Sequence, residues 1–336
     1  MNSFGRIFRI SIFGESHGPS VGITIDGCPA GIDLSAADFD TDIERRKGGI
    51  QKGTTPRTES DTPIFLSGVF NNKTTGAPLT IIFENNNTRS SDYERQRNIP
   101  RPGHADFVAG KKFGGHEDYR GGGHFSGRLT VCLVAAAVLA KKILATYQNI
   151  NCKATILEVG GEKDIEAGLQ KAIDAKDSIG GIIECRVTGL PIGLGEPFFD
   201  SVESVISHAV FAIPAIKGIE FGAGFAAAKM KGSEHNDALE NESGKTTTNH
   251  AGGIVGGLSN GNEIVFRVAV KPTSSTPKEQ HTLNIASGVM EDFSVKGRHD
   301  LCIALRVPVV LEAVTAFVLA DLLMQEKKIE RVIFNE

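Results

Sequence analysis

The chain has 336 residues, of which 40% are hydrophobic and 23% are charged. These fractions are typical of soluble globular proteins and exclude wholesale disorder. The net charge of −4 provides no overall field that favours nucleic acid or an anionic membrane, so any anion site must come from local basic clusters. The 39 glycines exceed the roughly 24 expected from average usage and occur in clusters, which indicates tight loops rather than a collagen-like repeat.

The five cysteines are scattered, odd in number and without C-x-x-C spacing. This pattern argues against a disulfide framework and a structural zinc site, and it fits a reducing cytoplasm. Residues 1–18 lack the apolar core of a signal peptide, and the longest apolar run, 129–140, is shorter than the ~20 residues of a membrane span. We therefore expect a cytoplasmic protein that does not cross a membrane. Because tryptophan is absent and tyrosine scarce, stacking on nucleic-acid bases is not expected either.

Taken in chain order, the patterns predict strands, helices and polar loops in alternation. Residues 18–32 indicate a strand and a turn, and 34–46 an N-capped helix with basic residues at its end. Residues 62–84 alternate and are β-branched, with a hairpin-like break at "NNKTTGAP". Residues 87–128 are polar and lack periodicity, which is typical of a long functional loop, and 128–147 predict an apolar helix.

The second half of the chain repeats this order. "TIDGCPAGI" at 24–32 resembles "RVTGLPIGL" at 186–194, and each is followed by a helix, strands, a polar loop and a long apolar helix. No linker or shift in composition separates the halves. We therefore predict a single domain over 1–336 with an internal pseudo-duplication, whose halves are roughly 1–150 and 151–336.

Several polar, glycine-rich stretches are candidates for chemistry, and none has the spacing of a P-loop or a G-x-G-x-x-G motif. They are "FGESHG", "RRKGGIQKGTTPR", "RPGHADF" with "GGGHFSGR", "NHAGGIVGG" with "KPTSS", and "KGRHD". A lone loop histidine is usually solvated or hydrogen-bonded, but the glycines beside His17 let the backbone approach a ligand. The histidines lack an H-x₃-H pair or a close cysteine partner, so we predict no metal site.

The basic side chains of these stretches exceed what a solvated helix end requires. Arginine forks suit carboxylate and phosphate, and "KPTSS" offers an ammonium group, hydroxyls and backbone N–H groups for a phosphate, although it also fits an ordinary loop. The glycines of "NHAGGIVGG" permit a flat surface against a planar ring, or a bend in a strand. Together the stretches predict a small polyanionic substrate and are compatible with a phosphorylated planar cofactor.

The motifs "FGESHG", "RPGHAD", "YRGGGxxSxR", "TNHAGGIVGG", "KPTSS" and "KGRHD" occur in the order found in chorismate synthases. The chain resembles that family from Phe4 to about Leu323. The resemblance implies an α/β fold with helices sandwiched between antiparallel sheets, assembled as a homotetramer. It also implies a lyase of the shikimate pathway of aromatic amino acid biosynthesis, which converts 5-enolpyruvylshikimate 3-phosphate to chorismate and phosphate. Reduced FMN is required without net redox change, and the lack of a large insertion implies an external supply of reduced flavin.

The resemblance assigns roles to particular residues. His17 would face the substrate phosphate, His104 would lie against the pyrimidine end of the flavin, and Asp300 would handle the proton at flavin N5, with Ser16 and Ser126 as relays. The substrate or NADP would be bound by Arg45, Arg46, Lys52, Arg101 and Arg128. The flavin would be bound by His124, Phe125, Ser126, Ala215, Gly256, Lys271, Pro272, Thr273, Ser274, Ser275 and Arg298.

The central loop departs from the commoner family form "GGGRSSARET". Here it is "GGGHFSGRLT", so His124, Phe125 and Leu129 replace an arginine, a serine and a glutamate. Two other functions fit the same residues. A flavoprotein oxidoreductase would oxidise its substrate on balance, and an anion- or nucleic-acid-binding protein would bind nucleic acid in a strongly salt-dependent manner.

Overall fold

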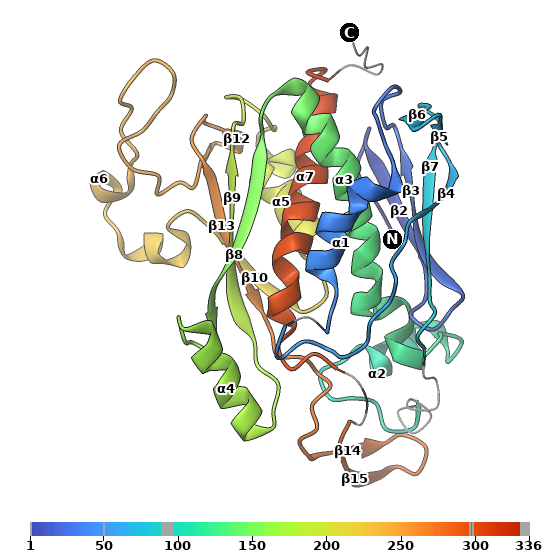
Figure 1. The fold of residues 1–336 in the computed structure, drawn as a ribbon. Coiled ribbons are helices and arrows are strands. Elements are labelled where there is room, and N and C mark those ends of the chain that lie inside the picture. The colour runs from blue at the N-terminus through green and yellow to red at the C-terminus, as the bar shows by residue number, and fades with distance from the viewer. Residues whose placement is uncertain (1, 50, 89–96, 296, 298, 330–336) are drawn as a thin grey trace.

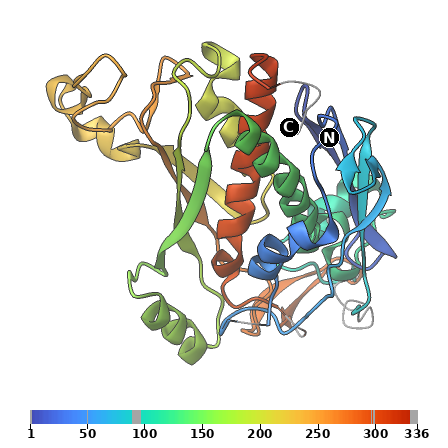
Figure 2. The ribbon, with the colours of Figure 1, turned by 45° about the horizontal axis from the view of Figure 1, so that its top comes forward.

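The computed structural model describes residues 2–49, 51–88, 97–295, 297 and 299–329. Two antiparallel sheets enclose a layer of helices (Figure 1 and Figure 2). The predicted α/β sandwich of helices between antiparallel sheets is confirmed.

The first sheet comes from the N-terminal quarter of the chain. Its strands in spatial order are β1 (Ser3–Phe4), β2 (Arg9–Gly14), β3 (Ser20–Asp26), β7 (Leu79–Glu84) and β4 (Ile64–Ser67). Val21, Ile23 and Ile25 of β3 are fully buried, and Ile81 of β7 lies opposite Ile23. The period of two in these β-branched residues directs one face of the sheet to the core.

The second sheet repeats the strand order of the first. Its strands are β8 (Asn151–Val159), β9 (Gly181–Thr188), β13 (Ile264–Val270) and β10 (Ile216–Phe221), which parallels β2-β3-β7-β4. The turns after β3 and β9 also match, because Gly27 and Gly189 have φ of 76° and 81°. A Cβ would lie 1.9 Å from the Ile7 carbonyl oxygen at the first position and 2.4 Å from that of Asn149 at the second. The pseudo-duplication and its halves stay a prediction, to which this matching order adds support.

A layer of α-helices lies between the sheets (Figure 1). They are α1 (Asp40–Arg46), α3 (Thr130–Tyr147), α5 (Val202–Val210) and α7 (Val307–Gln325). The remaining helices, outside this layer, are α2 (Asp106–Phe113), α4 (Ile165–Ala175) and α6 (Gly232–His235). Small hairpins pair β5 (Val69–Phe70) with β6 (Lys73–Thr74), β11 (Ile254–Val255) with β12 (Leu258–Ser259), and β14 (Gln280–Asn284) with β15 (Val289–Phe293).

Helices α3 and α7 are buried on almost every side, as expected for helices that are apolar all round. By length and composition both could cross a membrane, but 72% and 94% of their most apolar windows are buried inside the protein. The carboxylate of Asp321 in α7 is accommodated in this layer because it accepts the backbone N–H groups of Arg6, Ile7 and Phe8 at 2.7–2.9 Å.

The polar stretch 87–128, expected to be a loop, contains α2 and two 3₁₀ helices, η4 (Arg120–Phe125) and η5 (Gly127–Leu129). All residues of α2 are described, and Ala109 is the only one of them that is buried. The sequence therefore has no apolar stripe that would predict this helix. The helix ends at Gly114, whose φ of 64° forms a left-handed cap.

Candidate active site

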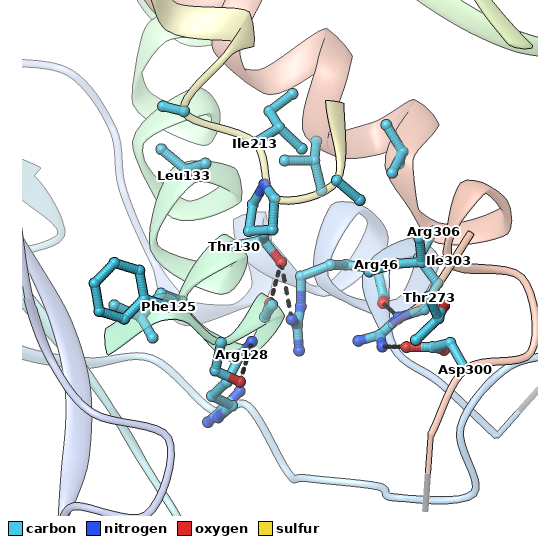
Figure 3. Close-up of a pocket in the computed structure, with 18 of the residues that line it drawn as sticks. Arg46, Phe125, Arg128, Thr130, Leu133, Ile213, Thr273, Asp300, Ile303 and Arg306 are labelled. Carbon is cyan, nitrogen blue, oxygen red and sulfur yellow. Dashed lines mark hydrogen bonds and ion pairs between the residues drawn. The ribbon is translucent and has the colours of Figure 1, made fainter. Parts of the chain in front are cut away.

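A cavity of about 650 Å³ opens at the N-terminal ends of α3 and α7 (Figure 3). Its volume lies within the ~300–1,000 Å³ of small-molecule sites. Backbone N–H groups at a helix N-terminus carry partial positive charge, so two such ends favour an anionic ligand. Among the described residues the lining comes mainly from 46–61, 101–105, 121–133, 208–215, 271–275 and 299–310.

Arg46 and Arg128 share one buried carboxylate, that of Asp61. Asp61 Oδ2 accepts from Arg46 Nη2 at 2.9 Å, and Asp61 Oδ1 accepts from Arg128 Nη1. Burial lowers the pKa of Arg46 to about 10; Asp61 opposes this effect, and Arg306 and Arg128 reinforce it. Burial alone would raise the pKa of Asp61, but the two arginines hold it below its usual range. Two cations on one carboxylate leave a surplus of positive charge.

Two buried polar atoms at the cavity have no hydrogen-bond partner among the described residues. One is Nε of Arg46, whose Nη1 donates to Thr130 Oγ1 at 3.2 Å. The other is the hydroxyl of Thr273. A buried polar group without a partner costs about 1–3 kcal/mol, so both atoms indicate a polar ligand in the cavity.

Asp300 lines the cavity and ties two segments together. Its Oδ1 accepts the N–H of Thr55 at 2.8 Å. Its Oδ2 accepts from Arg306 Nη1 at 2.9 Å (Figure 3). Arg306 Nε also donates to the carbonyl oxygen of Arg46 at 2.8 Å. The start of α7 is thereby bound to the segment after α1, which places Arg306 beside Arg46.

Ser16 and His17 lie against the glycines of η4, Gly121 to Gly123, of which Gly121 lines the cavity. These three glycines have φ between 52° and 82°. A Cβ added at Gly121, which lines the cavity, would lie 2.4 Å from His17 Cδ2 and 2.6 Å from His17 Nε2. Only glycine therefore allows the imidazole to come this close. Ser16 is held by its N–H to the Gly123 carbonyl oxygen at 3.1 Å and by Arg57 Nη1 to its Oγ at 3.2 Å.

Arg101, His104 and Asp106 form a second ionic cluster. Asp106 Oδ2 accepts from Arg101 Nε at 2.7 Å, and Asp106 Oδ1 lies 2.5 Å from His104 Nδ1. Arg101 Nη1 donates to Ser275 Oγ at 3.0 Å. Burial would raise the pKa of Asp106, but hydrogen bonds from Arg101 and His104 hold it well below its usual range.

The loop Lys271–Ser275 after β13 supplies a polar part of the wall. Lys271 Nζ donates to Ser274 Oγ at 2.6 Å and to the Gly103 carbonyl oxygen at 3.0 Å, and burial lowers the pKa of Lys271. The neighbouring Ala215 accepts the Lys271 N–H at 2.9 Å and has a φ of 73°, which residues with a Cβ normally avoid. Backbone strain of this kind collects at functional sites.

The rest of the wall is apolar and aromatic. Figure 3 shows Leu133 and Ile213 on the side away from the guanidinium groups. Phe125 is 41% exposed, and its ring centroid lies 6.4 Å from that of Phe113. The adjacent His124 donates from Nδ1 to the Gly14 carbonyl oxygen at 2.7 Å. The cavity therefore combines a cationic side with an apolar one.

Most of the predicted site residues meet at this cavity although they are far apart in the sequence. Those that line it are Arg46, Arg101, His104, His124, Phe125, Ser126, Arg128, Ala215, Lys271, Pro272, Thr273, Ser274, Ser275 and Asp300. Their chemical roles remain predictions.

Other predicted residues do not line the cavity within the described part of the chain. Arg45 donates to Glu312 of α7 at 2.6 and 2.8 Å, so its charge is already paired. Lys52 points outward and donates to a glutamine of α4 at 2.8 Å. Gly256 is exposed at the turn between β11 and β12. Arg298 lies outside the described residues.

The sequence reasoning missed Asp61, Asp106 and Arg306. Asp106 belongs to the motif "RPGHAD", two residues after His104, and that spacing was the available signal. Asp61 and Arg306 carry no such signal, because an isolated aspartate or arginine usually lies on the surface. The structure alone places them at the cavity, buried or half-buried beside other charges.

The comparisons with known proteins agree with one another. The family model described as chorismate synthase matches residues 8–324, and a curated chorismate synthase of Chitinophaga pinensis is 72% identical over 335 residues, covering 100% of both chains. The chain belongs to the chorismate synthase family. A curated chorismate synthase of Dehalococcoides mccartyi is 43% identical over 364 residues and covers 99% of each chain.

A solved crystal structure of a chorismate synthase has the same fold. It superposes with a TM-score of 0.74 at 25% sequence identity, covering 96% of this chain and 93% of that one. Family membership confirms the resemblance inferred from the motifs and supports chorismate synthase activity.

Proposed function

We propose that the protein converts 5-enolpyruvylshikimate 3-phosphate to chorismate and phosphate with reduced FMN bound in the same cavity. The C3–O bond breaks with its electron pair leaving on phosphate. On balance the hydrogen on C6 leaves as a proton, and the C6–H electron pair enters the conjugated diene, so no net oxidation occurs. Family membership supports this reaction. The structural observation that carries the proposal is the gathering of guanidinium groups at two helix N-termini.

The charges of the cavity suit a substrate with one phosphate and two carboxylates. The described arginines of the lining are Arg46, Arg57, Arg101, Arg128 and Arg306. Four carboxylates pair with these five guanidinium groups, because Asp61 serves two of them. Lys271 adds a further positive charge and contacts neutral oxygens. A polyanion would balance this surplus and accept from the free Nε of Arg46.

The cavity also fits a phosphorylated planar cofactor. Lys271, Thr273 and Ser274 would hold its polar groups, since the Thr273 hydroxyl is buried without a partner among the described residues. The apolar wall around Leu133 and Ile213 would cover its ring. When bound, reduced flavin would lend electron density to the allylic system as phosphate leaves, which ordinary side chains do not supply.

The chain's own groups would bind, orient and move protons. Arg46, Arg128 and Arg306 would orient the anionic groups of the substrate. His17, which lies beside the cavity residue Gly121, would give a proton to the departing phosphate once the bound substrate brings that phosphate within hydrogen-bond reach. Asp300 would handle the proton at flavin N5.

We also propose a homotetramer in the cytoplasm, supplied with reduced flavin from outside the chain. Phe198, Phe199 and Phe225 are 86%, 92% and 84% exposed, and they are the side chains that we expect other subunits to cover. Sedimentation velocity of the purified protein measures the mass; a monomer would contradict this part of the proposal.

The deciding experiment is anaerobic. Protein is mixed with 5-enolpyruvylshikimate 3-phosphate and chemically reduced FMN, and chorismate is followed by its ultraviolet absorbance; a parallel sample contains oxidised FMN. We expect many turnovers with reduced flavin and none with oxidised flavin. Flavin oxidised in proportion to product would instead favour an oxidoreductase.

His17→Ala should lower turnover by ~10²-fold or more with FMN binding retained, because it removes the proton donor. Gly121→Ala should act in the same direction, since its Cβ would displace the imidazole. Gly115→Ala is the matched control: φ is 80° there, but the added Cβ meets no described atom within 4 Å. If both glycine variants lost activity equally, backbone strain rather than His17 would explain the loss.

A further inference from the structure

We infer that Asp106 is a positioning residue that holds His104 as the tautomer protonated on Nδ1, which leaves the lone pair on Nε2. This inference rests on the proposed function for its catalytic meaning. It concerns a carboxylate that does not itself line the cavity among the described residues but lies directly behind the imidazole.

The first observation is the distance of 2.5 Å between Asp106 Oδ1 and His104 Nδ1. A carboxylate that is ionised can only accept, so Nδ1 must carry the hydrogen. The pKa of Asp106 is held well below its usual range, with the hydrogen bonds of Arg101 and His104 outweighing burial, so the carboxylate is ionised at neutral pH.

The second observation is the position of the Arg101 guanidinium. Its Nη2 lies 3.2 Å from His104 Nε2 and 3.0 Å from Nδ1. Nη2 also donates to Asp106 Oδ1 at 2.8 Å. A guanidinium only donates, and Nδ1 uses its hydrogen toward the same carboxylate, so the ring acceptor open to Nη2 is the lone pair of Nε2. Both neighbours therefore favour the same tautomer.

The third observation is the rigidity of the support. Asp106 Oδ2 accepts from both the backbone N–H and Nε of Arg101, at 3.1 and 2.7 Å. Arg101 is held in turn by Ser275 at 3.0 Å. His104 itself lines the cavity, and at the adjoining Gly122 an added Cβ would lie 3.3 Å from His104 Nε2, so glycine leaves room for this nitrogen. His104 can thus accept or return a proton at Nε2, and Asp106 offsets the positive charge that forms.

The test is nuclear magnetic resonance of the full, cofactor-free chain labelled with ¹⁵N-histidine. Long-range proton–nitrogen spectra at alkaline pH report which ring nitrogen is protonated, and His104→Gln assigns the signals. We expect the Nδ1–H form in the parent protein. In Asp106→Asn the amide can donate to Nδ1, so we expect the Nε2–H form and at least a ~10-fold lower kcat.

Three further variants make the outcome decisive. Asp106→Glu should restore the Nδ1–H form, and Arg101→Gln should keep it. Asp26→Asn, in an exposed ion pair with Arg9, should change neither tautomer nor kcat. An unchanged tautomer in Asp106→Asn, or a changed one in Arg101→Gln, would overturn the inference. If the tautomer changes as expected but the parent protein makes no chorismate, the proposed function fails and the positioning role stands.

Discussion

In both ionic clusters of the cavity, one aspartate stands between two cationic groups. Asp61 lies between Arg46 and Arg128, which are 4% exposed at the side chain, whereas Asp106 lies between Arg101 and His104, and the imidazole is 20% exposed. The first cluster offers guanidinium groups, which only donate hydrogen bonds, while the second contains an imidazole, whose two ring nitrogens can donate or accept. We therefore interpret the first cluster as an anion-binding site and the second as a site of proton transfer.

Removing the carboxylate of the anion-binding site, that of Asp61, should have the largest effect on stability. Asp61→Ala leaves Arg46 and Arg128 buried without a counter-ion, and we expect a loss of about 3–5 kcal/mol in the free energy of unfolding. Denaturant unfolding measures it. Glu162→Ala, which breaks an exposed ion pair with Lys171, is the control and should cost at most about 1 kcal/mol. Equal losses in the two variants would show that Asp61 is not a buried counter-ion.

A milder change separates binding from proton transfer. Arg46→Lys keeps the charge but loses the planar fork, so we expect KM for the substrate to rise about 10-fold while kcat changes little. Steady-state kinetics with saturating reduced FMN provides the measurement. His104→Gln should show the reverse, with kcat lowered and KM nearly unchanged. A dominant kcat effect in Arg46→Lys would remove the distinction between the clusters.

The smallest effect concerns acid stability. The folded-state pKa values of Asp61 and Asp106 are depressed, so their contribution to stability is complete above the unfolded-state value of about 4 and is lost as pH falls below it. We expect the free energy of unfolding to decline between pH 4 and pH 2.5. The asparagine of Asp106→Asn cannot titrate, so the free energy of unfolding of this variant should decline less steeply over that range. A slope equal to that of the parent protein would mean that Asp106 contributes nothing to the linkage.

Much of the fold was predictable from local patterns. The alternation in 62–84, the capped helix at 34–46 and the two apolar helices are signals that neighbours in the sequence create by themselves. The similarity of the turns at Gly27 and Gly189 is also visible in the sequence. Both positions need glycine, because a left-handed backbone packed against a carbonyl oxygen leaves no room for a Cβ.

The sequence by itself therefore determined the motifs, the strand and helix periodicity and the family, since each depends on residues close together in the chain. Only the tertiary structure decided which charges share a buried site. Asp61 and Arg46 pack with Arg128, which is at least 67 residues away in the sequence. Arg45 instead pairs with Glu312 and does not line the cavity. Pairing of this kind depends on burial and on the surrounding charges, which arise when the sheets close over the helix layer and water is excluded.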